Sequence, residues 1–408
     1  MLQPRLCQAR ARGPPGHGYN QKVKFKTIYF VAGEVSADNH GAALMRSLRD
    51  LHLNLHFVGR GGPQMREIAG VQFKNWIGEA AVLGLWEVIR KYSYFQEQFR
   101  EALNEIEECK PDAVIMIDYP GFNLRLACTL RKRSRRQKII YYISPQVWAW
   151  NRGRIKKMAR HLDLMLCIFP FEVDLYNESG LRAVFVGHPM IERLETHRMD
   201  GQRDPNLIGL FPGSRLREVR KILPVLIETA DLLHRRKSSL RFEVAAASER
   251  LAAEIKRLWH RHTAGEPHRL EARPTIEIKI GETAAIMQRA LVGIVASGSA
   301  TLEAAYFRLP FVLIYKVAWP TYLAARLVVT VKYLGMPNVL ANKEVVPEFI
   351  QHQAKPSALF SAVWPLIENA QARARMVVEF DEIVGQLGKG DASKRAAQAI
   401  IDEIGRST

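Results

Sequence analysis

A strand, a Gly-Ser turn and an amphipathic helix follow one another near the middle of the chain and constrain its fold most strongly. The apolar run of residues 207–211 meets Pro212-Gly213-Ser214. A helix follows whose apolar face consists of Val219, Leu223, Leu226 and Ile227. Such a turn presents backbone N–H groups and a positive helix end, and Arg215 adds a guanidinium that suits phosphate. We interpret this stretch as a phosphate site, although most Gly-Ser turns between strand and helix bind nothing.

The same alternation of strand, turn and helix fills most of the chain. We expect strands at residues 27–32, 56–58, 111–117, 138–143, 163–169, 183–186, 208–211, 242–246, 275–280, 292–296 and 311–314, and only helices beyond Pro356. Strands that alternate with helices form parallel sheets. Because 408 residues are too many for one ordinary domain, the sequence predicts two doubly wound α/β domains.

The expected domains are residues 27–200 and 201–408, the second ending in helices, with a polar linker at residues 195–205. Residues 1–26 contain basic residues and no acidic one, and Gly13-Pro14-Pro15-Gly16 prevents a continuous helix there. We interpret them as a disordered basic tail or the product of an upstream start codon. A transit peptide is the alternative.

Composition narrows the class of protein. Lys and Arg number 59 against 41 Asp and Glu, and the net charge of +18 favours nucleic acid, an anionic membrane face or phosphorylated substrates as partners. Nucleic acid is the weaker interpretation, since no zinc-finger spacing or RNA-binding aromatic motif accompanies the bases. No apolar run has the length of a membrane span. The four cysteines have no paired spacing, so we expect reduced thiols in a cytoplasmic protein and no metal site.

Polar residues follow the first expected strand of the chain. Glu34, Ser36 and Asp38 stand after the glycine turn at its carboxyl end, where doubly wound sheets bind ligands. They could therefore line a cleft. The alternative is that Ser36 or Asp38 caps the following helix.

Asp118 ends the apolar strand of residues 111–117 and is a candidate general base. Helix capping is the competing role, for which Asn123 is better placed. A later strand ends in the loop of residues 144–150, which contains Ser144, Gln146, Trp148 and a second tryptophan. Tryptophans in such a loop either pack the domain or face a substrate.

Three further segments carry candidate residues. His188, after the last strand of the first half, either faces an interdomain cleft or is structural. The segment of residues 82–100 combines aromatic and basic side chains that suit a lipid surface, namely Trp86, Arg90, Lys91, Tyr94 and Phe95. An amphipathic helix packed on the sheet is the alternative there. Residues 297–301 form a second anion cradle with Gly298, Ser299 and Thr301, or an ordinary capped helix start.

These sequence motifs, in this order over about residues 26–395, resemble those of the lipid-A-disaccharide synthase family. The members of this family are nucleotide-sugar glycosyltransferases of the GT-B fold. The sharpest pieces are Asp118-Tyr-Pro-Gly-Phe-Asn123, Ser144-Pro-Gln-Val-Trp-Ala-Trp150, Phe211-Pro-Gly-Ser-Arg215, Ala296-Ser-Gly-Ser-Ala-Thr-Leu-Glu303, and Pro337-Asn338 with Glu344-Val-Val-Pro-Glu348. The resemblance implies two Rossmann-like domains that face a central cleft. Residues 27–200 would bind the acceptor and residues 201–408 the UDP-sugar. The implied acceptor or cleft residues are Glu34, Ser36, Asp38, Ser144, Gln146, Trp148 and His188.

It also implies an activity in lipid A biosynthesis. The family transfers 2,3-diacylglucosamine from its UDP derivative to 2,3-diacylglucosamine 1-phosphate, which gives a β-1,6-linked disaccharide 1-phosphate and UDP. The implied roles are Asp118 as the base or essential carboxylate, and a donor site at Ser214, Arg215, Gly298, Ser299, Thr301, Glu303 and Asn338. No cofactor or metal is expected. The enzyme would be cytoplasmic and would bind peripherally to the anionic surface of the inner membrane. A homodimer is compatible with the sequence.

The sequence departs from the family pattern at three positions. Ala37 replaces a glycine, Gly121 replaces a second acidic residue, and Gln146 replaces a serine. The change at Gly121 argues against a mechanism with two carboxylates. It leaves Asp118 as the acidic residue of this motif. Two rivals stay open: another GT-B enzyme, such as a UDP-N-acetylglucosamine 2-epimerase or a glucosaminyltransferase, and a basic nucleic-acid-binding protein.

Overall fold

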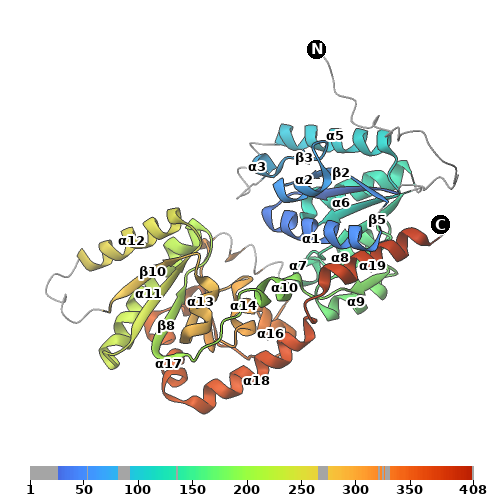
Figure 1. The fold of residues 1–408 in the computed structure, drawn as a ribbon. Helices are drawn as coiled ribbons and strands as arrows, with labels where there is room; N and C mark the ends of the chain where they lie inside the picture. Colours follow the sequence, from blue (N-terminus) through green and yellow to red (C-terminus); the bar gives the residue numbers. More distant parts are fainter. Residues whose placement is uncertain are drawn as a thin grey trace. The chain divides into compact units, whose positions relative to one another are not determined.

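The computed structural model divides the chain into two compact units, Met1–Pro189 with Asp391–Thr408 (unit 1) and Met190–Gly390 (unit 2) (Figure 1). The structure describes residues 26–52, 54–80, 92–134, 137–264, 274–319, 322–323, 326 and 331–406. Residues 1–25 of the basic tail lie outside these ranges. Each unit is described by itself.

Unit 1 is built on a parallel sheet in the order β3-β2-β1-β4-β5-β6-β7. Its strands are β1 (Lys26–Ala32), β2 (Leu55–Gly61), β3 (Lys74–Asn75), β4 (Ala113–Ile117), β5 (Lys138–Tyr142), β6 (Leu164–Cys167) and β7 (Ala183–Phe185). The helices between them are α1 (Val35–Leu51), α2 (Pro63–Ala69), α3 (Ile77–Ala80), α5 (Tyr92–Cys109), α6 (Pro120–Arg133), α7 (Val147–Trp150), α8 (Gly153–Ala159) and α9 (Pro170–Asn177).

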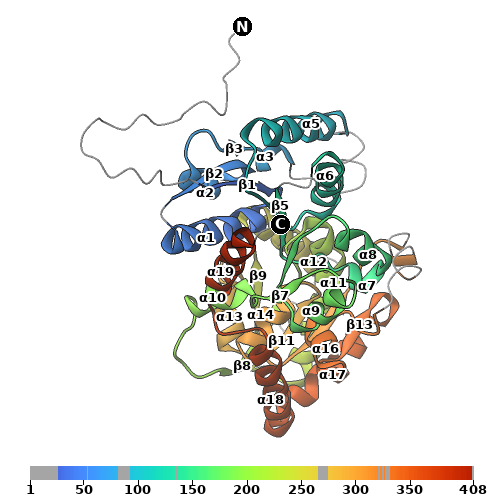
Figure 2. The ribbon, with the colours of Figure 1, turned by 90° about the vertical axis from the view of Figure 1, so that its right-hand side faces the viewer.

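Alternate residues of each strand enter two separate cores. In β1, Tyr29 and Val31 pack with α5, α6, α8 and α9, whereas Ile28 and Phe30 pack with α1 and α2. Figure 2 shows α5 and α6 on one face of this sheet and α1 on the other. Strands covered on both faces are apolar at every position, which is why they could be predicted from the sequence.

The last helix, α19 (Ala392–Gly405), corrects the expected domain division. Ala396, Ala397 and Ile400 are buried in the core of unit 1 beside α1, so the chain end returns to the first sheet instead of completing the second domain. Glu403 of α19 also forms a hydrogen-bonded ion pair with Arg182 and lies 3.2 Å from Lys138 Nζ. The boundary between the units lies at Pro189, before the polar stretch that we expected to be the linker.

Unit 2 contains a parallel sheet in the order β10-β9-β8-β11-β12-β13. The strands are β8 (Asp204–Phe211), β9 (Arg241–Ala246), β10 (Ile276–Ile280), β11 (Ala290–Ala296), β12 (Phe311–Tyr315) and β13 (Glu348–Ile350). Its helices are α10 (Pro189–Glu195), α11 (Leu216–Arg236), α12 (Glu249–Ala264), α13 (Thr283–Arg289), α14 (Ala300–Tyr306), α16 (Met336–Ala341), α17 (Pro356–Glu368) and α18 (Ala370–Gln386). The predicted apolar face of α11 is confirmed, because Val219, Leu223, Leu226 and Ile227 are all buried.

The strand expected at residues 56–58 is longer than predicted. Strand β2 continues through Gly59 and Arg60 to Gly61, and a Cβ at Gly59 would lie 2.2 Å from the carbonyl oxygen of Phe30 on the neighbouring strand. Arg60 is fully buried and donates to Glu105 Oε1 at 2.7 Å. The glycines therefore permit close packing of a strand that carries a buried ion pair.

Both sheets reverse their strand order beside their first strand. The reversal lies between β1 and β4 in unit 1 and between β8 and β11 in unit 2. Doubly wound sheets bind ligands outside the carboxyl ends of the strands at this switch point. The two expected phosphate cradles follow β8 and β11, and Glu34 and Asp118 follow β1 and β4.

Within the described residues, no helix is both long and apolar enough to cross a membrane.

Candidate functional site

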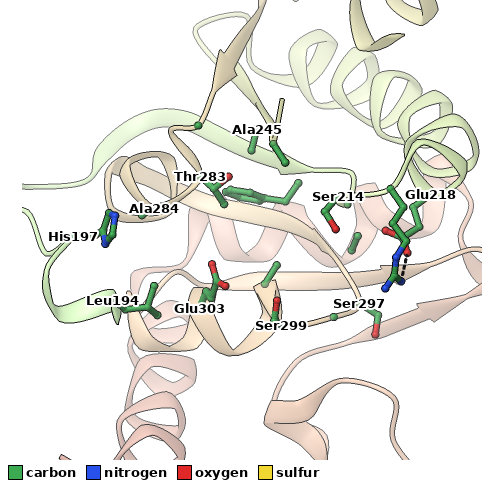
Figure 3. A pocket seen from close by; sticks show the side chains of 18 of the residues that line it. Leu194, His197, Ser214, Glu218, Ala245, Thr283, Ala284, Ser297, Ser299 and Glu303 are labelled. Atoms are coloured by element: carbon green, nitrogen blue, oxygen red, sulfur yellow. Dashed lines mark hydrogen bonds and ion pairs between the residues drawn. The ribbon is translucent and has the colours of Figure 1, made fainter. Parts of the chain in front are cut away.

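A cavity of about 450 Å³ lies in unit 2 at the carboxyl edge of its sheet (Figure 3). The turns after β8 and β11 form two of its walls, and α10 and α13 contribute to the others. It is lined by Arg193, Leu194, His197, Phe211, Gly213, Ser214, Arg215, Glu218, Ala245, Ala247, Gly281, Thr283, Ala284, Ala296, Ser297, Gly298, Ser299, Ala300 and Glu303. The sequence-predicted donor residues Ser214, Arg215, Gly298, Ser299 and Glu303 are therefore brought together.

The turn after β8 is shaped by Gly213, whose φ is +107°. A Cβ there would lie 2.7 Å from Glu218 Oε2, so the turn needs glycine to bring the backbone close to α11. No side chain of the described residues caps the first turn of α11, so its positive end is available to an anion. Glu218, in that first turn, binds the Arg215 guanidinium (Figure 3).

Arg215 is held only weakly in this structure. Its side chain is 72% exposed, and its Nη1 lies 3.1 Å from Glu218 Oε1. An exposed pair of this kind stabilises a protein by less than about 1 kcal/mol. The guanidinium can therefore turn from Glu218 to a phosphate at small cost.

The turn after β11 forms the second wall. Gly298 has a φ of +149°, and no atom of the part of the chain that the structure describes lies within 4 Å of the position that a Cβ would occupy. The Ser299 side chain borders the cavity (Figure 3). Thr301 is instead fully buried and donates its hydroxyl to the carbonyl of Gly298 at 2.8 Å, which closes the turn. The structure thus places Ser299 at the cavity and Thr301 behind it.

Glu303 of α14 directs its carboxylate into the cavity (Figure 3). Arg193 of α10 donates to its Oε1 at 2.7 Å. Arg193, His197 and Thr283 also line the cavity and were not predicted, because no local pattern separates them from ordinary surface residues. The cavity therefore holds two arginines, each paired with a glutamate.

Asn338 does not line this cavity. It is fully buried, donates to Glu348 Oε1 and the carbonyl of Val346 at 2.8 Å, and accepts from the N–H groups of Val345 and Val346. Its amide therefore holds the loop before β13 in place. A role in donor binding stays a prediction.

In unit 1, Asp118 stands at the switch point with an unusual backbone. Asp118 and Tyr119 have φ values of +47° and +52°, in the left-handed region that non-glycine residues rarely adopt. Asn123 and Tyr141 both donate to the carbonyl of Asp118, at 2.7 and 2.5 Å, and fix this turn. Strained backbone held by its surroundings is typical of functional sites.

The Asp118 carboxyl group has a raised pKa. Burial is the main cause, and the negative charge of Glu34 at the end of β1 adds to it. A higher pKa makes the carboxylate a stronger base, which suits proton abstraction. The exposed Glu34 is thus the neighbour that tunes Asp118.

Replacement of Glu34 should shift the pH dependence of the reaction. In Glu34→Gln, the loss of a nearby negative charge lowers the pKa of Asp118, so the carboxylate forms at lower pH. We expect the acid limb of the kcat/KM profile to move to lower pH. An unshifted limb in the folded variant would contradict the coupling.

The other residues after β1 have separate roles. Asp38 is buried and accepts from the N–H groups of Gly62, Gln64 and Met65, each at 3.0 Å. Asp38 therefore fixes the start of α2. The capping alternative expected it to cap α1 instead, so the capped helix differs from the prediction. Ser36 is exposed on α1.

The loop of residues 144–150 is anchored by Glu172, which was not predicted. Glu172 is fully buried on α9 and accepts from Ser144 Oγ at 2.9 Å, Trp148 Nε1 at 3.0 Å and the N–H of Phe169 at 3.2 Å. Ser144 and Trp148 thus hold the loop, whereas Gln146 is exposed. The His188 ring packs 5.2 Å from the Phe169 ring, in agreement with the structural alternative.

Burial raises the pKa of Glu172 to about 7 from its ordinary 4.5, against hydrogen bonds that lower it. Between these pH values the folded chain keeps a proton that the unfolded chain has lost, so the free energy of unfolding falls as pH rises. Glu172→Gln removes this dependence. Relative to the variant, the wild-type protein should lose on the order of 3 kcal/mol between pH about 4.5 and about 7. Denaturant unfolding at several pH values measures this, and a pH-independent difference would contradict the shifted pKa.

The residues proposed to meet a membrane are only partly described. Trp86, Arg90 and Lys91 lie outside the described residues. Tyr94 and Phe95 lie in the first turn of α5 with ring centroids 5.6 Å apart, and the half-buried Phe95 packs against the core of unit 1. Within residues 82–100, the alternative of an amphipathic helix that packs on the sheet therefore holds for the part that begins α5.

Comparisons with known proteins agree with this architecture. The family model of lipid-A-disaccharide synthetase matches residues 28–401. The lipid-A-disaccharide synthases of Persephonella marina and Geobacter sulfurreducens are 33% and 34% identical, over 92% and 93% of this chain and 98% and 97% of theirs.

Two solved structures share the fold at low sequence identity. MurG from Acinetobacter baumannii has a TM-score of 0.57 at 13% identity, over 92% of this chain and 99% of that one. UDP-GlcNAc 2-epimerase from Neisseria meningitidis, bound to UDP-GlcNAc, has a TM-score of 0.55 at 12% identity, over 92% and 100%.

The two doubly wound sheets, with a ligand cavity at the switch point of the second, define a GT-B-type fold. Within this fold class, the family model and the relatives at one-third identity decide between the rivals. The chain belongs to the lipid-A-disaccharide synthase family and is a glycosyltransferase that uses a UDP-sugar.

Proposed function

We propose that the enzyme transfers 2,3-diacylglucosamine from UDP-2,3-diacylglucosamine to 2,3-diacylglucosamine 1-phosphate with inversion at the transferred carbon. The observation that carries this proposal is the unit 2 cavity, in which two arginines and the start of α11 converge at the switch point. Such a site suits the diphosphate of a UDP-sugar.

In the proposed reaction, Asp118 removes the proton from the 6-hydroxyl of the acceptor. The hydroxyl oxygen attacks the anomeric carbon of the donor from the face opposite UDP, and the bond to the diphosphate breaks. The products are the β-1,6-linked disaccharide 1-phosphate and UDP, which carries away the bonding electrons. Arg215 and the amino end of α11 would stabilise the charge that develops on the departing diphosphate.

We propose that the donor site needs no cofactor or metal, because these residues can balance the charge of UDP themselves. Ser214, Ser299 and the turn at Gly298 would contact the diphosphate, and Glu303 would accept from the ribose hydroxyls. Glu303 is also the ion-pair partner of Arg193. Donor binding would then release Arg193 from this pair.

The two-chain acceptor also implies a membrane contact. Exposing an acyl chain to water costs about 0.8 kcal/mol for each CH₂ group, so the enzyme would meet the lipid at an anionic cytoplasmic surface. We propose residues 82–100 as the contact. Trp86 and the exposed part of the half-buried Phe95 would be its interfacial side chains, and Arg90, Lys91 and Arg100 its bases.

The double substitution Trp86→Ser with Phe95→Ser should reduce sedimentation with anionic vesicles and lipid turnover together, while UDP binding stays unchanged. Trp319→Ser is the control, because Trp319 is an exposed aromatic residue of unit 2. If the double variant sediments like the wild type, these aromatics are ordinary core and the membrane contact lies elsewhere.

Product analysis separates this function from its nearest rival. Purified enzyme is incubated with UDP-2,3-diacylglucosamine and labelled 2,3-diacylglucosamine 1-phosphate, or with UDP-N-acetylglucosamine alone. We expect labelled disaccharide and UDP in the first reaction and unchanged sugar nucleotide in the second. Epimerised sugar in the second reaction, without disaccharide in the first, would overturn the proposal.

A further inference from the structure

A second cavity, of about 400 Å³, lies in unit 1 between α6 and α8, which are labelled in Figure 2. On α6 it is bordered from Pro120 and Gly121 to Thr129. This is a length of about 14 Å at the rise of an α-helix. Because Pro120 is two residues beyond Asp118, one end of the groove opens beside the proposed base.

The floor of the groove is apolar. Ala127, Met158 and Leu162 are buried members of the unit 1 core, and the half-buried Leu124 packs against them. An apolar surface at the bottom of a groove gains free energy when a hydrocarbon covers it, at about 25 cal/mol for each Å². The groove therefore favours a ligand with an aliphatic part.

The rim of the groove is basic. Arg125, Arg154, Lys157 and His161 line it, and no carboxylate is among the described lining residues. The Arg154 guanidinium lies 4.7 Å from the centre of the Trp150 ring and that of Arg125 lies 5.9 Å from the centre of the Phe99 ring. Within the described ranges neither guanidinium forms an ion pair. Arginines stacked on aromatic rings keep their hydrogen-bond donors free for an anion.

The surroundings of His161 are also electropositive. Burial lowers its pKa, and the positive charges of Arg131, Lys132 and Arg160 lower it further. A basic rim above an apolar floor is complementary to a lipid that carries a phosphate.

We propose that this groove binds the acceptor lipid, with one acyl chain on the floor formed by Leu124 and Met158 and the phosphate at Arg154 and Lys157. The inference rests on the proposed function and adds a location for the acceptor. The acceptor alone of the two substrates carries a monophosphate, and the position of the groove next to Asp118 leaves its sugar hydroxyl near the base. Arg154 and Lys157 are three residues apart on α8 and so lie on the same side of the helix.

The test combines two variants with three ligands. Cys128→Trp fills the groove, because Cys128 is a half-buried lining residue. Arg154→Gln with Lys157→Gln removes the rim charge. Arg133→Gln with Lys156→Gln is the matched control, since both bases are exposed on α6 and α8 but do not line the groove. The ligands are the acylated acceptor, deacylated glucosamine 1-phosphate and inorganic phosphate.

For the acylated acceptor, we expect about a tenfold rise in KM in both groove variants, with an unchanged Kd for UDP and no rise in the control. For glucosamine 1-phosphate, only the rim variant should bind more weakly, because this ligand has no chain. Inorganic phosphate should compete weakly, and only in proteins that keep the rim. An acceptor KM that stays at the wild-type value in the exposed rim variant would overturn the proposal, even if Cys128→Trp does not fold.

Direct binding keeps this test independent of the reaction. Equilibrium binding of the acylated acceptor in detergent micelles should follow the same order of variants even if no disaccharide forms, in which case the proposed function fails and the groove remains a lipid phosphate site. Competition by an oligonucleotide, but not by the lipid, would contradict the proposal and indicate a nucleic-acid surface.

Discussion

Asp118→Asn should lower kcat on the order of a hundredfold or more and leave UDP binding and folding nearly intact. Asparagine keeps the size and most hydrogen bonds of the side chain but cannot accept the acceptor proton. The turn itself should survive, because Asn123 and Tyr141 bind the main-chain carbonyl of residue 118 and not its side chain. Single-turnover rates with saturating donor and acceptor measure the effect on chemistry.

Asp112→Asn provides the matched control. Asp112 precedes the other end of the same strand, β4, and accepts from the N–H of Thr27 at 2.8 Å, which an asparagine oxygen can also do. The control loses the same charge from the same strand and should keep wild-type turnover. If a correctly folded Asp118→Asn enzyme turns over like this control, Asp118 is not the base.

Arg215→Ala should raise the donor KM about tenfold to a hundredfold, because a hydrogen bond to a charged group contributes about 1.5 to 3 kcal/mol. The side chain is 72% exposed and lies beside the cavity, so its removal should change stability little. Donor KM, UDP affinity and the midpoint of thermal unfolding are measured together.

Arg217→Ala is the control for charge. Arg217 lies in the same first turn of α11, is exposed, and does not line the cavity. The donor KM of the Arg217→Ala enzyme should stay at the wild-type value. The phosphate role fails if Arg215→Ala loses stability while its donor KM and kcat remain those of the wild type.

Much of the fold could be predicted because buried parallel strands are apolar at every position and their turns contain glycine or proline. The apolar face of α11 and the polar residues at both switch points followed from these patterns. The sequence did not predict which sheet α19 packs on, since an amphipathic helix can cover either one. In the structure, Ala396 and Ile400 pack in the core of unit 1.

The site was predicted where its residues stand in turns, and missed where they depend on distant partners. Ser214, Arg215 and Ser299 meet at the cavity as expected. No sequence pattern indicated that Glu172 is buried, because a glutamate in a helix usually faces water. Its hydrogen-bond partners Ser144 and Trp148 are also distant in the sequence. The place of Arg193 at the cavity was not predicted for the same reason, because its partner Glu303 is distant in the sequence and lies close only in the folded chain.

The configuration of the new glycosidic bond shows whether the enzyme transfers the sugar with inversion, as proposed. The full chain is supplied with the UDP-linked donor and the lipid monosaccharide phosphate, and the anomeric proton of the purified product is examined by NMR together with the amount of UDP released. We expect a single β-1,6-linked disaccharide 1-phosphate, formed in equal amount to UDP. An α-linked product, or UDP released with free diacylglucosamine and no disaccharide, would contradict it.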